Sequence, residues 1–256
     1  KQIIKSYQNY NERKRLGSFL QYNRKVWKEY LKGHSYKKNS IILTECNSLL
    51  WTYGHMALAQ ITAKTLNAQV AYFGNNNANR ILRESLGPCL HFDLDEIKKK
   101  YKKEIVKETN IIFCKLKYPS EILEIKYNNL LIGDLIYDAA LRVGRWKATI
   151  HQVDATVFNS IKTAVEYIFC LDSIYEKYDV KAVCSTHKTG FLGILFRYAV
   201  NKNTLGISGS IGSGTIRKHY HFNGRRLPYS QSVNKPFIDF VLNSSDIKEK
   251  LILKSK

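Results

Sequence analysis

Two side chains that can accept a proton follow the first predicted strand, in the segment ECNSLLWTYGH at 45–55. Glu45 and His55 could each take a proton from a hydroxyl group near neutral pH, which is the work of a general base. Asn47 and Tyr53 lie between them in the sequence and could bind the same substrate through hydrogen bonds. The segment is predicted to be a loop, and a helix-capping loop with a hydrogen-bonded histidine would account for the same residues.

A second set of candidates lies in LLIGDLIYDAALR at 130–142. Gly133 permits a tight turn, and Asp134 can cap the helix that follows. Asp138 and Arg142 are four residues apart, so they share one face of that helix and can form an ion pair. Asp134 is the third catalytic candidate, and Asp138 and Arg142 are candidates for substrate binding. A helix cap and a surface ion pair would explain the pattern equally well.

Cations and glycines follow the last two predicted strands. His187 and Lys188 come directly after a strand and could bind a hydroxyl group, a carboxylate or a diphosphate. The segment at 206–226 combines four glycines with Arg217 and further cations, which suits contact with phosphate, although a hinge is the alternative. It has neither the ending of a P-loop nor the spacing of the dinucleotide fingerprint. Because zinc-ligand spacing is also missing from the sequence, we expect no metal and no cofactor.

An α/β fold is needed to bring these candidates together. Hydrophobic patterning predicts two strand–helix–strand units, which imply a Rossmann-like parallel sheet flanked by helices. Ligands of such sheets bind beyond the carboxyl ends of the strands, so Glu45, His187 and Lys188 should meet at one edge. Between the units we expect a lysine-rich helix, a further strand and two more helices. In chain order, the predicted elements are 40–44, 54–67, 68–73, 93–109, 110–116, a helix from Asp134, 152–178, 180–186, 190–202 and 204–209.

Three regions are expected along the chain. Residues 1–38 form a basic amphipathic helical arm, which either packs on its own domain or attaches to an anionic membrane surface. Residues 39–222 form the Rossmann-like domain. Residues 223–256 form a linker and either the start of a second domain or a C-terminal tail.

Three segments resemble a family of bacterial capsule and surface-polysaccharide biosynthesis proteins, which are predicted to be glycosyltransferases of the GT-B type. IGDLIYDAALR at 132–142 is similar to the IGDLIYDxYLR signature of that family, from which it departs at Ala140. The segments at 42–73 and 183–206 are similar to two strand-and-helix regions of the same family. The resemblance covers the acceptor-side, N-terminal domain of a GT-B enzyme, whereas such enzymes have two Rossmann-like domains.

The resemblance implies a metal-independent glycosyltransferase. Its donor would be a nucleotide sugar and its acceptor a lipid-linked sugar or a polysaccharide. A base among Glu45, His55 and Asp134 would deprotonate the acceptor hydroxyl, and cations such as His187, Lys188 and Arg217 would contact the departing phosphate. A non-catalytic acceptor-binding domain is an alternative. The implied location is the cytoplasm, on the inner face of the cell membrane.

The charge of the chain fits more than one kind of partner. Lys and Arg number 41 against 21 Asp and Glu in 256 residues, a formal charge of +20. Such an excess is also typical of nucleic-acid-binding proteins, which are the second alternative. The cations are spread along the chain, however, and the predicted parallel sheet matches no RNA-binding module. We therefore expect attraction to anionic membranes and phosphorylated sugars, and no nucleic-acid partner.

Overall fold

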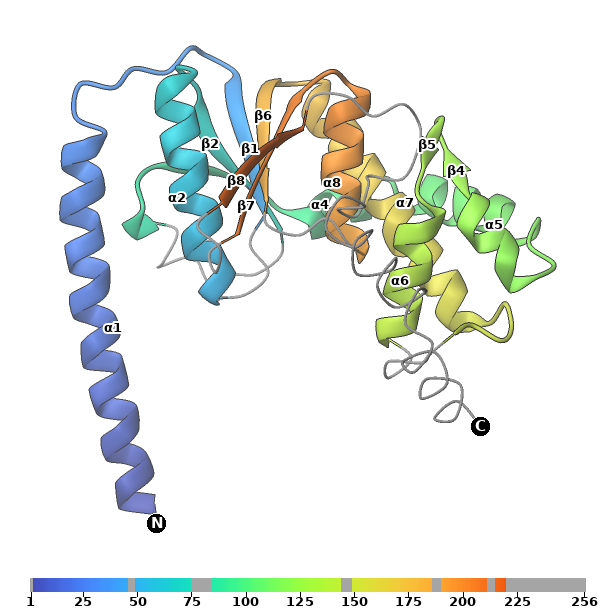
Figure 1. Ribbon diagram of the computed structural model, residues 1–256, viewed down its shortest axis with the longest axis horizontal. Coiled ribbons are helices and arrows are strands. Elements are labelled where there is room, and N and C mark those ends of the chain that lie inside the picture. The colour runs from blue at the N-terminus through green and yellow to red at the C-terminus, as the bar shows by residue number, and fades with distance from the viewer. Residues whose placement is uncertain are drawn as a thin grey trace, which may run out of the picture. The chain divides into compact units, whose positions relative to one another are not determined.

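The computed structural model describes residues 2–45, 49–74, 84–143, 149–185, 190–210 and 215–219 (Figure 1). All of them belong to the first of two units into which the chain divides, Lys1–Phe222. The second unit, Asn223–Lys256, lies outside the described residues.

The unit is built on a six-stranded sheet with the order β3-β2-β1-β6-β7-β8. Five strands are parallel, and β8 at the edge runs antiparallel to β7. Counted within this sheet alone, the order is 3-2-1-4-5-6, which is that of the doubly wound Rossmann fold. The strands are β1 (Ser40–Glu45), β2 (Gln69–Phe73), β3 (Cys89–Phe92), β6 (Asp179–Ser185), β7 (Leu205–Ser210) and β8 (Thr215–His219).

Helices cover both faces of the sheet (Figure 1). Successive residues of β1 point to opposite faces: Ile41 and Leu43 join one core, with α7 and α8, and Ile42 joins the other, with α2. Burial on both faces explains why the central strands are apolar without alternation. The helices are α1 (Gln2–Tyr30), α2 (Leu49–Thr65), α4 (Leu94–Lys100), α5 (Lys102–Phe113), the short 3-10 helix η2 (Pro119–Glu124), α6 (Gly133–Val143), α7 (Ala155–Tyr175) and α8 (Gly190–Asn201), and β4 (Lys126–Tyr127) pairs with β5 (Leu130–Leu131) before α6.

The C-terminal half of α1 contacts the core on the α2 side. Leu20 and Trp27 are buried there with residues of α2 and β1. Lys64 of α2 donates to the carbonyl oxygen of Tyr30, and its ammonium group lies 4.1 Å from the centre of the Tyr30 ring. Within the described part of the chain, no helix combines the length and the apolar character needed to cross a membrane.

Both predicted strand–helix–strand units are present, but α2 begins earlier than predicted. It starts at Leu49, so Tyr53 and His55 lie on a helix and not in a loop. Gly54 lies within this helix, where glycine costs about 1 kcal/mol relative to alanine. Burial of Met56 and Ala59 against the sheet offsets that cost and keeps the first turns helical.

The strand predicted at 110–116 is wrong, because α5 continues to Phe113. Ile105 and Thr109 are buried one turn apart, and the Phe113 ring packs edge-on against Phe158 of α7 at 5.2 Å. This spacing of three to four residues is helical. The single lysine-rich helix predicted at 93–109 is instead two helices, α4 and α5, which divide at Tyr101.

The strand predicted at 204–209 is present as β7, and Gly206 and Gly209 lie in it. Arg217 lies in β8, which pairs with β7 as a hairpin and was not predicted. Residues 211–214 and 220–226 lie outside the described residues.

Candidate functional site

The site is positioned by the divergence of the chain after β1 and β6. These two strands are parallel neighbours in the middle of the sheet. After β1 the chain passes to α2 on one face, and after β6 it passes to α8 on the other face. In open α/β sheets, ligands bind in the crevice outside the carboxyl ends of strands that diverge in this way.

Two polar residues end these two strands. Ser185 closes β6 and donates its hydroxyl hydrogen bond to the carboxylate of Glu45, the last residue of β1. Glu45 is 1% exposed and Ser185 is fully buried. A carboxylate is costly to bury, and hydrogen bonding recovers only part of that cost. A buried carboxylate at the edge where ligands bind is therefore a candidate for chemistry.

The strand register places two more polar residues in a row with Glu45 and Ser185, on β7 and on the outermost strand β8. Ser185 lies opposite Ser208 of β7, and Ser208 lies opposite Arg217 of β8. Glu45, Ser185, Ser208 and Arg217 therefore occupy adjacent positions on four neighbouring strands. The sequence analysis offered Arg217 as a phosphate contact or as part of a hinge, and the hairpin brings its backbone to the same row as Glu45.

His55 contacts the backbone of the same strand end. Its Nδ1 lies 3.2 Å from the carbonyl oxygen of Glu45. Because a carbonyl oxygen can only accept, Nδ1 is the donor in this contact. His55 is 2% exposed, so both predicted bases lie below the surface at one strand end.

An aromatic wall faces Glu45 from α7 and α8. The ring of Tyr167 packs edge-on against Phe73 at 5.4 Å and stacks with Phe191 at 6.2 Å. Burial, and after it the negative charge of Glu45, raises the pKa of the Tyr167 hydroxyl. Tyr167 thus remains a protonated hydrogen-bond donor near the carboxylate. The sequence did not single it out, because a tyrosine on the inner side of a long helix is typical of a core.

Asp134, the first carboxylate of the segment IGDLIYDAALR at 132–142, pairs with the buried side chain of Arg197. Arg197 of α8 donates from both terminal nitrogens to the two oxygens of Asp134, at 2.5 Å each, and also to the carbonyl oxygen of Leu131 at 2.8 Å. Arg197 is 2% exposed. This forked geometry fixes α6 against α8. It gives Asp134 a structural role, and catalysis by Asp134 stays a prediction.

Asp138 of α6, the second carboxylate of the segment IGDLIYDAALR, lies close to the beginning of α8. The predicted ion pair is present, since Arg142 donates from Nε to Asp138 at 3.1 Å. A Cβ atom built on Gly190, the first residue of α8, would lie 3.6 Å from the other oxygen of Asp138. A carboxylate is favoured at a helix N-terminus. Asp138 thus lies beside the helix that follows β6, and substrate binding by Asp138 and Arg142 stays a prediction.

Gly133 is needed for a different reason from the one predicted. A Cβ atom at this position would lie 2.1 Å from the carbonyl oxygen of Ile122 and 2.6 Å from the backbone of Leu123. The backbone of η2 therefore passes too close for any side chain, and its φ is not in the left-handed region. Gly133 therefore allows α6 to pack closely against η2.

Several predicted site residues are not placed. Asn47, His187 and Lys188 lie outside the described residues, and for Tyr53 only the helical backbone is described. Sequence reasoning missed Ser185, Ser208 and Tyr167. Ser185 could have been found, because it directly precedes the cationic segment that was selected after the same strand. Among the described residues, no group of three or more His, Cys, Asp or Glu side chains could hold a metal ion.

Comparisons with protein-family models, with curated proteins and with solved structures give no match to this chain. The strand order and the site therefore define the class of the protein: an α/β protein with a five-stranded parallel sheet of the Rossmann-like kind.

Proposed function

We propose that this protein is a glycosyltransferase that moves a sugar from a nucleotide-activated donor to a lipid-linked or polysaccharide acceptor in bacterial surface-polysaccharide biosynthesis. The observation that carries the proposal is the buried pair of Glu45 and Ser185 at the point where β1 and β6 diverge. This is the place at which an α/β sheet binds a ligand. GT-B architecture is the finer form of the proposal, with the described unit as the acceptor-side domain.

The three segments that resemble the polysaccharide family all border this site. One runs from within β1 through α2 and β2, another runs from the end of β6 through α8 to the start of β7, and the signature forms most of α6. α6 holds α8 through the pair of Asp134 and Arg197. The most distinctive segment of the sequence therefore supports the helix that follows the site, although it is distant from Glu45 in the chain.

In the proposed reaction, the Glu45 carboxylate takes the proton of an acceptor hydroxyl. The acceptor oxygen then bonds to the anomeric carbon of the donor, and the bond from that carbon to the phosphate oxygen breaks. The electron pair leaves with the nucleotide, and the proton remains on Glu45. Ser185 orients the carboxylate through its hydrogen bond. His55 is the alternative base, acting through Nε2.

The departing phosphate carries negative charge that the protein must stabilise. Arg217 lies on the row of Glu45 by strand register, on β8. His187 and Lys188 follow Ser185 directly in the sequence. We assign these three cations to the phosphates of the donor, which would place the donor beyond the ends of β6 and β7.

A donor screen tests the proposal. The full chain is incubated with labelled UDP-, GDP-, CMP- and dTDP-sugars and with lipid-linked oligosaccharides from encapsulated bacteria, and transfer and nucleotide release are measured. We expect one donor class to support transfer, and Glu45→Gln to abolish most of it. If no donor gives transfer or nucleotide release, the proposed activity is wrong.

We propose as well that α1 attaches the protein to an anionic membrane surface. Leu16, Phe19, Tyr22 and Val26 recur every three to four residues and are each at least 41% exposed. Exposed apolar side chains on a basic helix favour the membrane interface, where each cation contributes on the order of 1 kcal/mol. The cations of this part of α1 and of the residues after it are Arg24, Lys25, Lys28 and Lys32.

Vesicle co-sedimentation tests the attachment. The wild-type chain should sediment with phosphatidylglycerol vesicles and not with phosphatidylcholine vesicles. Replacing Phe19 and Val26 by serine should release it, because both side chains are more than 40% exposed and contribute little to the core. Equal sedimentation of the variant and the wild type would exclude α1 as the attachment.

A further inference from the structure

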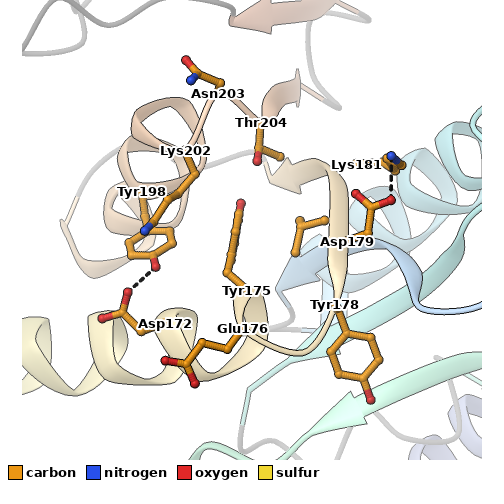
Figure 2. A pocket seen from close by; sticks show the side chains of 11 residues that line it. Asp172, Tyr175, Glu176, Tyr178, Asp179, Lys181, Tyr198, Lys202, Asn203 and Thr204 are labelled. Atoms are coloured by element: carbon orange, nitrogen blue, oxygen red, sulfur yellow. Dashed lines mark hydrogen bonds and ion pairs between the residues drawn. The ribbon is translucent and has the colours of Figure 1, made fainter.

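A pocket of about 570 Å³ opens at the amino edge of the sheet, where β6 begins (Figure 2). This edge is opposite to the carboxyl edge, where β1 and β6 end at Glu45 and Ser185. It is formed by the ends of α7 and α8 and by the chain that enters β6 and β7. Its volume is in the range of small-molecule sites. None of its lining residues belongs to the site at Glu45.

One wall of the pocket is a hydrogen-bonded polar pair, in which Tyr198 is buried and Asp172 is half-buried. Tyr198, 4% exposed, donates its hydroxyl hydrogen bond to Asp172. Burial, and then this bond, raises the pKa of Tyr198, so the phenol keeps its proton and Asp172 keeps its role as acceptor. The ammonium group of Lys202 lies 5.4 Å from the centre of the Tyr198 ring. The wall is thus fixed before any ligand arrives.

Tyr175 stands in the middle of the pocket. Its ring packs edge-on against Tyr198 at 5.0 Å, and its hydroxyl points toward Thr204 (Figure 2). The hydroxyl is buried but lacks the geometry of a full hydrogen bond to any described residue. Burial raises its pKa, so it stays a donor. A buried donor without a bond is costly, and a ligand oxygen would remove that cost.

The end of α8 presents two further polar side chains at fixed positions. Asn203 adopts the left-handed conformation with φ 57, and the amide of Thr204 bonds to the carbonyl of Ala199 at 2.8 Å. With the bond from Asn203 to Val200 at 3.0 Å, this is a Schellman ending. Asn203 offers an amide donor and acceptor, and Thr204 offers a hydroxyl.

The lining carries charges of both signs, so it disfavours a ligand with several charges of one sign. Asp172, Glu176 and Asp179 would repel an anion, and Lys181 and Lys202 would repel a cation. Asp179 and Lys181 already pair at 2.6 Å. A neutral ligand with many hydroxyl groups can instead use the donors and the acceptors together, because each hydroxyl both donates and accepts.

We infer that this pocket is a saccharide-binding site, separate from the catalytic edge and not dependent on the proposed reaction. The ligand class is a neutral oligosaccharide, with hydroxyls bound by Glu176, Asp172 and Lys202 and with a sugar ring beside Tyr175.

Saturation-transfer NMR on the full chain tests the inference. The probes are maltotriose, cellotriose, mannotriose and chitotriose, with inorganic phosphate and spermidine as charged competitors. We expect at least one oligosaccharide to bind, and Glu176→Gln and Lys202→Met each to weaken it about tenfold through loss of a charged hydrogen bond. Both side chains are exposed, so these variants keep the fold. Glu104→Gln and Lys107→Met, exposed on α5, are matched controls and should bind as the wild type does.

Glu45→Gln should keep this binding whether or not the protein transfers sugar, which separates the inference from the proposed function. The inference is overturned if none of the four oligosaccharides binds, if binding is indifferent to both pocket variants, or if phosphate or spermidine displaces the sugar.

Discussion

Two polar side-chain pairs, one at each edge of the sheet, differ in their exposure to solvent. At the carboxyl edge, Glu45 and Ser185 are 1% and 0% exposed and bond to each other. At the amino edge, Asp179 and Lys181 pair with side chains 46% and 39% exposed. Burial of a carboxylate is costly, whereas an exposed pair costs almost nothing. Stability alone therefore explains the pair of Asp179 and Lys181 but not the pair of Glu45 and Ser185, for which function is the better explanation.

Helix direction sharpens the contrast. The helices that follow β1 and β6 begin near the carboxyl edge, and the positive ends of their dipoles favour a carboxylate there. At the amino edge, α7 and α8 end, so their dipoles disfavour Asp172 and Glu176. Lys202 compensates for that in the pocket. Carboxylates placed against the dipole, in a pocket with cations, favour a neutral ligand over a charged one.

The largest effect should come from breaking the buried pair that supports α8. Arg197→Met leaves Asp134 without its guanidinium partner, and loss of one member of a buried pair costs about 3–5 kcal/mol. Urea unfolding measures the change. Arg142→Met is the control, because the exposed pair of Arg142 with Asp138, the other carboxylate of α6, is worth about 1 kcal/mol or less. Equal losses in the two variants would contradict the structural role of Asp134.

The next largest effect concerns the carboxyl edge itself. Glu45→Gln keeps the size of the side chain but removes the base, so we expect sugar transfer to fall by about 100-fold or more with unfolding little changed. Glu104→Gln, exposed on α5 and outside both sites, is the matched control and should leave the rate of transfer unchanged. An equal loss in both variants would mean that the change of charge, and not its place at the carboxyl edge, lowers the rate.

A smaller effect is expected where backbone packing positions α6. Gly133→Ala places a methyl group 2.1 Å from the Ile122 carbonyl oxygen and should cost about 1–3 kcal/mol in thermal or urea unfolding. Gly17→Ala on α1 meets nothing within 4 Å and should be neutral or slightly stabilising, since alanine favours helices. A neutral Gly133→Ala would show that η2 can move away from α6.

Local patterning predicted the centre of the fold. The apolar runs of β1 and β6 and the helical spacing of Asp138 and Arg142 are short-range signals, and the structure contains both strands and the ion pair. The strands β3 and β8 were missed, because strands at the edges of the sheet are short and carry no clear alternation. Edge strands depend on partners that are far away in the sequence.

The site was predictable only in part for the same reason. Glu45 and His55 were selected because they follow a strand, and the structure brings both to one strand end. The partner of Asp134, Arg197, is 63 residues away, and that of Glu45, Ser185, is 140 residues away. No local spacing encodes these pairs, since they arise from the order of the strands and the packing of α6 on α8.

The smallest effect tests the amino edge. Hydrogen bonds from Lys181 and Ser40 hold the pKa of Asp179 below its ordinary value, so its ionised form stabilises the fold at neutral pH. That stability is present above the pKa of the unfolded chain, near pH 4, and is lost as the pH falls through the lower pKa of the folded state. Asp179→Asn should therefore lower stability by less than about 1 kcal/mol at pH 7, because the pair is exposed. The difference from the wild type should vanish at low pH. A difference that persists at pH 2 would mean that Asp179 acts through packing, and the amino edge would then resemble the carboxyl edge more than its exposure indicates.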